Sequence, residues 1–286
     1  MKVSVVTDEV SSDPETALEI LHSWGVTHVE LRAIDDTRFP MISDYWQVRL
    51  PQLLDEFGLH VVAISPGLFQ VPPPGRVRPP LFFNRTGDMR AVRDALHDEA
   101  RLDEHVNKLL PASIEAAQRL GAQSIICFAF FSRSDHTEAD LVSDAAIQVM
   151  RHAAQKVAEA GLTLNIEVSE PSQRTADIVR RVDHPALGIN WDPGAAYQGG
   201  EEVPFPDGFD LLRPYIRHVH FKDVTTEPTG ARTVVVDGVI DWRGAFAALR
   251  ADNFDGYISV ETHRRPKIDS TFRMLERLRA LIALPG

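Results

Sequence analysis

The chain has almost no cysteine and no long apolar segment. Cys127 is the single cysteine among 286 residues, and it lies in the apolar run 125–129. No disulfide can therefore form within one chain, and a small buried residue is expected at this position. No run of about 18 apolar residues occurs, and the apolar stretch after Met1 is too short for a signal peptide. The sequence thus predicts no membrane association and a cytoplasmic location.

Basic residues and flexible linkers are also scarce. The chain has 30 lysines and arginines against 41 acidic residues, which gives a formal net charge of −11. Such a field repels phosphate backbones, so nucleic acid is not an expected partner. No Gly/Ser-rich linker divides the sequence, and 44% hydrophobic with 25% charged residues is typical of a globular protein. We therefore expect one domain over residues 1–286, which could form a homo-oligomer.

Short β-prone runs alternate with helical patterns along the chain. Glycine ends several of the helical patterns, at Gly25, Gly58, Gly121 and Gly161, because it adopts the left-handed conformation at little cost. Alternating strands and helices imply a parallel sheet. Eight units predict a closed (β/α)8 TIM barrel, with an open doubly wound sheet as the alternative. The expected strands lie at residues 3–7, 27–31, 60–65, 123–128, 163–168, 187–192, 216–220 and 257–261.

The segment 66–101 interrupts this alternation. It follows the third expected strand and is rich in proline, glycine and phenylalanine, which disfavours both helix and strand. In a barrel, the loop after a strand lies on the catalytic face. The segment is therefore a candidate lid or substrate wall, and a surface excursion without function is the alternative.

Four consecutive strands each place one potential metal ligand at the C-terminal end. The side chains are Glu167, Asp192, His220 and Glu261. Because barrel active sites form at the C-terminal ends of the strands, these side chains should converge, unless they are polar only for solubility. Three carboxylates and one imidazole suit one divalent ion, Mn²⁺, Mg²⁺ or Co²⁺, and Zn²⁺ is also compatible.

Other polar residues near these strand ends are candidate substrate contacts. His218 shares a face with His220, because residues two apart in a strand point the same way, and it should lie a layer below. Lys222 could donate a hydrogen bond to an oxyanion or pair with Asp223. His263 and Arg264 follow Glu261 and could contact the substrate or simply lie on the surface.

These segments resemble the xylose-isomerase-like barrel superfamily of sugar (phosphate) isomerases and epimerases. The resemblance runs over nearly the whole chain and rests on segments 166–167, 190–194, 218–223, 238–242 and 256–263. It implies that Glu167, Asp192, His220 and Glu261 bind the metal. Where ketose-epimerase relatives have substrate-binding His and Arg, this chain has Ala195 and Thr226, and Ser169 replaces another frequent histidine. A free-ketose epimerase is therefore less well matched than the metal site.

The expected reaction is proton removal next to a carbonyl group. A divalent ion would polarise the carbonyl of a sugar or polyol-derived ketone and stabilise an enediolate, while Glu167 and Glu261 would move the proton. This predicts an isomerase or epimerase. The alternative for the two glutamates is that both only bind the metal and neither moves a proton. A metal-dependent lyase or dehydratase would use the same enolate. A sugar-binding protein without activity or a nuclease fits the retained ligands and the acidic charge less well.

Overall fold

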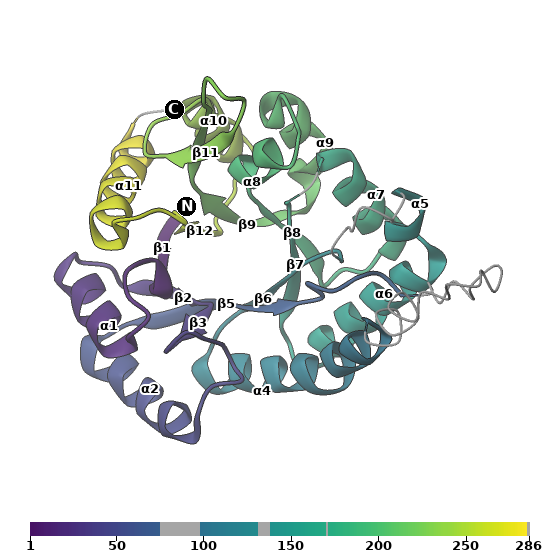
Figure 1. Ribbon diagram of the computed structural model, residues 1–286, viewed down its shortest axis with the longest axis horizontal. Coiled ribbons are helices and arrows are strands. Elements are labelled where there is room, and N and C mark those ends of the chain that lie inside the picture. Colours follow the sequence, from purple (N-terminus) through teal and green to yellow (C-terminus); the bar gives the residue numbers. More distant parts are fainter. Residues whose placement is uncertain (75–97, 131–137, 170, 285–286) are drawn as a thin grey trace, which may run out of the picture.

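In the computed structural model, eight parallel strands close into a ring that is surrounded by helices (Figure 1). The structure describes residues 1–74, 98–130, 138–169 and 171–284. The strands follow chain order around the ring, and the last pairs with the first, so the predicted (β/α)8 barrel is confirmed and the open sheet is excluded. The barrel strands are β1 (Lys2–Val6), β2 (His28–Leu31), β5 (His60–Leu68), β6 (Ser124–Cys127), β7 (Thr163–Glu167), β8 (Leu187–Trp191), β9 (Ile216–Phe221) and β12 (Tyr257–Val260).

The helices begin and end largely as the sequence predicts. Asp13 caps the first helix by accepting a hydrogen bond from the Thr16 backbone N–H at 2.8 Å. Gly58 and Gly121 end two others with φ of 65° and 70°, as expected for left-handed caps. The helices are α1 (Pro14–Ser23), α2 (Asp44–Phe57), α4 (Leu110–Leu120), α5 (Glu138–Leu141), α6 (Asp144–Glu159), α7 (Ser172–Val182), α8 (Pro193–Gln198), α9 (Phe209–Leu212), α10 (Trp242–Ala251) and α11 (Lys267–Ala283).

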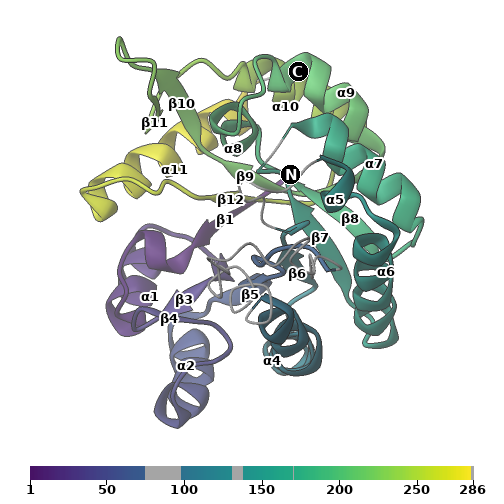
Figure 2. The same cartoon turned by 45° about the vertical axis from the view of Figure 1, so that its right-hand side comes forward.

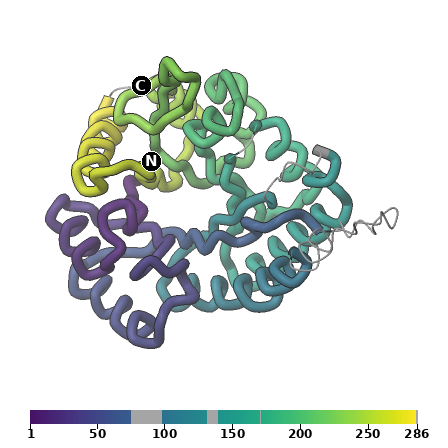
Figure 3. Tube along the Cα trace, viewed as in Figure 1, coloured from purple at the N-terminus to yellow at the C-terminus, as the bar shows by residue number. Residues whose placement is uncertain are grey.

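Two small antiparallel hairpins extend from the C-terminal ends of barrel strands. Strands β3 (Ala33–Ile34) and β4 (Thr37–Arg38) follow β2. Strands β10 (Asp223–Thr226) and β11 (Arg232–Val235) follow β9 and stand outside the ring (Figure 2). The trace in Figure 3 shows the first, purple segment beside the last, yellow segment, where β1 and β12 close the barrel.

The segment after the third barrel strand is more regular at both ends than the sequence predicted. Strand β5 continues through Pro66 and Gly67 to Leu68. Its pairing with β6 shifts between Ile64 and Leu68, so the strand tolerates a proline, which has no backbone N–H to donate, at this irregularity. Residues 98–104 are helical. The middle of the proposed lid 66–101, residues 75–97, lies outside the described residues.

The expected apolar core joins strand residues such as Val5 and Leu164 to helix residues such as Leu18 and Leu278 in one buried cluster. Cys127 is fully buried, and burial raises the pKa of its thiol, which agrees with a packing role. Among the residues that the structure describes, no helix is both long and apolar enough to cross a membrane.

Candidate metal centre and active site

The four predicted ligands meet at the C-terminal ends of β7, β8, β9 and β12. Their ligand atoms all lie within 4.8 Å of one another. His220 Nδ1 lies 3.3 Å from Glu261 Oε2, 3.9 Å from Asp192 Oδ2 and 4.0 Å from Glu167 Oε1. Consecutive parallel strands thus bring together residues that are up to 94 positions apart in the chain, counted from Glu167 to Glu261.

The cluster has the chemistry of a divalent metal site. His220 Nδ1 is buried, faces three carboxylates and makes no well-formed hydrogen bond with any described residue. An imidazole nitrogen in that position has a free lone pair to offer once it is deprotonated. Three carboxylates around it supply oxygen ligands and negative charge, a donor set that suits Mn²⁺, Mg²⁺, Co²⁺ or Zn²⁺. The residues present therefore fit one bound divalent cation.

Lys222 points into this cluster. Its Nζ lies 2.7 Å from Asp192 Oδ2 and 2.8 Å from Glu261 Oε2. The alternative pairing with Asp223 is wrong, because neighbouring residues of an extended chain point to opposite sides, and Asp223 contacts Arg277 instead. Gly194 gives the lysine room, since a Cβ at that position would lie 2.7 Å from Lys222 Cγ.

Lys222 also neutralises part of the acidic cluster. Burial on its own would lower the pKa of Lys222, but Asp192, Glu261 and Glu167 outweigh burial and raise it. The ammonium therefore stays charged among the carboxylates. It reduces the negative charge that a metal ion would otherwise have to balance alone.

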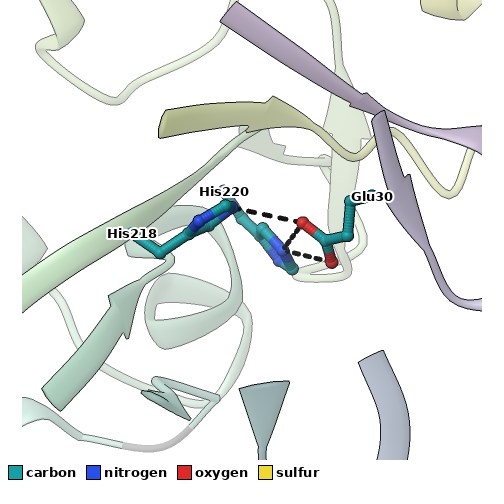
Figure 4. A group of neighbouring side chains, drawn as sticks. All are labelled: Glu30, His218 and His220. Atoms are coloured by element: carbon teal, nitrogen blue, oxygen red, sulfur yellow. Dashed lines mark hydrogen bonds and ion pairs between the residues drawn. The ribbon is translucent and has the colours of Figure 1, made fainter. Parts of the chain in front are cut away.

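Glu30 on β2 is a residue that the sequence analysis did not identify. Its carboxylate is fully buried and lies 3.1 Å from His220 Nε2 (Figure 4). Ser65 Oγ donates a second hydrogen bond to Glu30. Burial would raise the pKa of Glu30, but His220 and His218 outweigh it and hold the pKa well below its usual range. An ionised Glu30 accepts a hydrogen bond from Nε2–H of His220, which leaves Nδ1 of His220 directed at the ligand cluster.

His218 lies below the ligand cluster, as its position in β9 predicted. It is buried, and its Nε2 lies 2.8 Å from Ser259 Oγ. The same nitrogen lies 3.2 Å from Glu30 Oε2 (Figure 4). It does not line the pocket described below. His218 thus contacts buried protein groups and does not face the cavity in which a substrate could bind.

Arg32, directly after β2, holds Glu261 from the other side. Its guanidinium donates to Glu261 Oε1 at 2.7 Å and pairs with Asp8 at 2.7 Å and Glu9 at 2.6 Å. His263 Nε2 lies 3.1 Å from the same Glu261 oxygen. The first two barrel strands are followed by Asp8, Glu9 and Arg32. The reasoning that polar residues at the C-terminal ends of the strands converge therefore applied to these residues as well.

The two glutamates have different surroundings. Glu261 contacts four basic groups, from Arg32, His220, Lys222 and His263. Burial would raise the pKa of Glu261, but Lys222, His220 and His263 outweigh it and hold the pKa well below its usual range. For Glu167, burial and then the charge of Glu261 raise the pKa to about 7. Among the described residues, His220 is the single basic group within 4.0 Å of the Glu167 carboxylate.

A pocket of about 240 Å³ opens beside the cluster. Glu167, Glu261 and His263 line it, so three predicted site residues face a common cavity. Arg264 does not line it, because its exposed side chain turns away to donate to the Val234 carbonyl oxygen. The lining residues are Arg32, Arg38, Ser65, Gly67, Gln70, Ile126, Phe128, Glu167, Ser169, Glu261 and His263.

Known proteins share this sequence pattern and architecture. Inosose dehydratase of Geobacillus thermodenitrificans is 28% identical over 166 residues, which cover 49% of this chain and 53% of that protein. The match thus spans about half the length of the curated relative. A crystal structure of IOLI protein with a binding zinc atom has a TM-score of 0.70 at 15% identity and covers 99% and 98% of the two chains. The structure of L-ribulose 3-epimerase has a TM-score of 0.69 at 16% sequence identity. This match covers 99% of this chain and 95% of that chain.

The family assignment rests on a match that extends over most of the barrel. A family model described as "Xylose isomerase-like TIM barrel" matches residues 18–281, from α1 to α11. This range contains all four converging ligands and the residues that hold them, apart from Asp8 and Glu9. The chain therefore belongs to the xylose isomerase-like TIM barrels.

Proposed function

We propose that the protein is a metal-dependent carbon–oxygen lyase that removes water from a sugar or polyol-derived ketone. The observation that carries this proposal is the difference in contacts between Glu167 and Glu261. Glu261 contacts four basic groups, whereas Glu167 faces the pocket with one basic neighbour among the described residues. Epimerisation by two bases needs two carboxylates that can exchange protons, and elimination needs one.

Glu167, Asp192, His220 and Glu261 would hold the metal ion, which would polarise the carbonyl group of the bound ketone. Glu167 would take the proton from the carbon next to that carbonyl. Lys222 stays charged beside the ligands and would stabilise negative charge that develops on the substrate oxygen. His263 lines the pocket and would protonate the departing hydroxyl, which leaves as water.

Isomerisation or epimerisation is the second candidate and the one that the sequence analysis favoured. The structural similarity to L-ribulose 3-epimerase over 99% of the chain supports it, as does the presence of Glu261 in the pocket lining. Both reactions begin with removal of the same proton. They differ in whether an oxygen leaves before a proton returns.

The test is incubation of the Mn²⁺-loaded protein with ketoses, keto-inositols and 3-keto-glycosides in D₂O, followed by NMR and mass spectrometry. We expect loss of water from at least one ketone. Retention of every oxygen, with deuterium next to the carbonyl, would instead identify an isomerase or epimerase. Loss of an aglycone from a 3-keto-glycoside would keep the lyase assignment but replace water as the leaving group.

The base is tested by Glu167→Gln at Mn²⁺ concentrations that saturate the variant. We expect the rate to fall about 10²–10⁴-fold with metal still bound, because the amide cannot take a proton. Glu276→Gln, on the exposed face of α11, is the matched control and should keep the wild-type rate. A metal-loaded Glu167→Gln with the wild-type rate would rule out Glu167 as the base.

A further inference from the structure

The pocket beside the metal centre contains two arginines with different surroundings. Arg32 is nearly buried and has Asp8, Glu9 and Glu261 within 2.7 Å. The exposed Arg38 also lines the pocket, and its guanidinium donates to the Ser65 carbonyl oxygen at 3.2 Å. Within the described parts of the chain, no carboxylate oxygen lies within 4.0 Å of the Arg38 guanidinium.

The fold holds Arg38 at this place. It belongs to β4, whose hairpin with β3 rises from the C-terminal end of β2. Gly67 lies beside it in a left-handed conformation with φ of 74°, and a Cβ there would lie 3.7 Å from Arg38 Nε. Glycine thus meets the backbone requirement and keeps the neighbourhood of the guanidinium clear of a side chain.

The charge of Arg38 is not balanced by its surroundings. Partial desolvation, and then the charge of Arg32, lower the pKa of Arg38 despite the more distant carboxylates Asp8, Glu167 and Glu261. A guanidinium has five donors in a planar fork that fits a carboxylate or phosphate through two parallel hydrogen bonds. Most of these donors have no partner among the described residues.

We infer that Arg38 forms an anion-binding subsite, and that the substrate is an acidic ketone with a carboxylate or phosphate group away from the reacting carbon. This inference rests on the proposed function, because it takes the ketone to be bound between the metal ligands and Arg38. It adds a substrate class that the metal centre alone does not specify. Glu167 faces the same pocket, so one substrate can reach the base and Arg38 together.

The test compares three ligands of one sugar scaffold by calorimetric titration of the Mn²⁺-loaded protein. Glucose is neutral, glucuronate carries a carboxylate and glucose 6-phosphate carries a phosphate, so the two charged ligands separate the two sources of negative charge. We expect one of them to bind about 10–100-fold more tightly than glucose, as a charge-assisted hydrogen-bond pair predicts. This preference should weaken with added salt.

Arg38→Gln should remove the preference for the anion, and Arg38→Lys should keep part of it. Arg273→Gln, at an exposed arginine of α11, is the control and should bind like the wild type. Equal binding of the three sugars, no binding of either anion, or a preference that survives Arg38→Gln would overturn the subsite. Because the readout is binding, this outcome is independent of whether elimination or epimerisation is found.

Discussion

At the scale of single residues, the proposed metal centre includes a buried carboxylate that is not one of its four proposed ligands. Glu30 is enclosed in the barrel and contacts two imidazoles and one hydroxyl. Burying a carboxylate is costly unless it is paired, so these contacts keep it ionised. Glu30 thereby selects which nitrogen of His220 faces the cluster.

Glu30→Gln should weaken Mn²⁺ binding about 10–100-fold, the usual effect of losing a partner of a metal-binding histidine. The amide has nearly the same volume and still offers a carbonyl oxygen, but His220 loses the negatively charged acceptor of its Nε2–H group. Isothermal titration with Mn²⁺ measures the change, and circular dichroism checks the fold. Glu15→Gln, at an exposed glutamate of α1, should bind normally. Unchanged affinity in Glu30→Gln would contradict the positioning role.

Sequence pattern predicted that Glu167, Asp192, His220 and Glu261 lie together, because each ends a β-prone run and parallel strands must bring such ends together. It did not predict Glu30 or Arg38. Glu30 lies between Val29 and Leu31, inside an expected strand and not at its end. The one feature of the sequence that could have indicated a role for Glu30 is the presence of a charged residue between apolar ones. The position of Arg38 depends on a two-residue strand, which is too short to recognise from alternation.

At the scale of elements, the side chain of Asp223 links the β10–β11 hairpin to the segment before α10 and to α11. Asp223 is fully buried, and its Oδ1 accepts hydrogen bonds from the backbone N–H groups of Val224 and Ile240. Its Oδ2 lies 2.8 Å from the guanidinium of Arg277 on α11. Lys222 directly precedes Asp223, so the contacts of Asp223 also fix the backbone position from which the Lys222 side chain extends.

Asp223→Ala should lower the free energy of unfolding by about 3 kcal/mol, because two buried N–H groups lose their acceptor and the partly buried guanidinium of Arg277 loses one of its two carboxylate partners. Asp223→Asn keeps one acceptor oxygen and should cost about half as much. Urea denaturation followed by circular dichroism measures both. Asp237→Ala removes an exposed carboxylate from the same arginine and should cost no more than about 1 kcal/mol. Equal costs at positions 223 and 237 would refute this role of Asp223.

Strand and helix positions followed from local signals, and one segment shows where those signals fail. Apart from the end of the third strand, the glycine-ended helices and the strands after them lie within about two residues of their predicted positions. Pro66 and Gly67 predicted an early end of the third strand. The register shift against β6 accommodates both residues, and a shift in pairing has no signature in a single sequence.

At the scale of the whole molecule, the metal centre links folding stability to pH. The folded chain binds protons at Glu167 and His220 more tightly than the unfolded chain, because the pKa of Glu167 is raised to about 7 and burial of His220 is outweighed by Glu30 and Glu261, which raise its pKa. These two groups stabilise the metal-free protein at low pH, and that contribution is lost as the pH rises through their folded pKa values. A metal ion must displace the same protons.

Mn²⁺ should therefore raise the melting temperature more at pH 8 than at pH 6. Ligand binding to the folded state alone stabilises it in proportion to the logarithm of concentration over dissociation constant, and proton competition weakens the binding at pH 6. Differential scanning fluorimetry with and without Mn²⁺ measures the shift. Asp192→Ala should show no shift at either pH. A wild-type shift that is equal at the two pH values would contradict proton-coupled binding.

The closure of the barrel between β1 and β12 has a consequence for synthesis of the chain. Arg32 and Glu261 are 229 residues apart, and Thr262 donates a hydrogen bond to Glu9 across 253 residues. On the ribosome, Arg32 and Glu9 emerge long before Glu261 and Thr262, and β1 presents an unpaired edge until the final strand arrives. Contacts so distant in sequence form late. The cluster of Glu167, Asp192, His220 and Glu261 is therefore completed only when the last strand of the barrel docks, so the proposed metal site does not exist in a partly made chain.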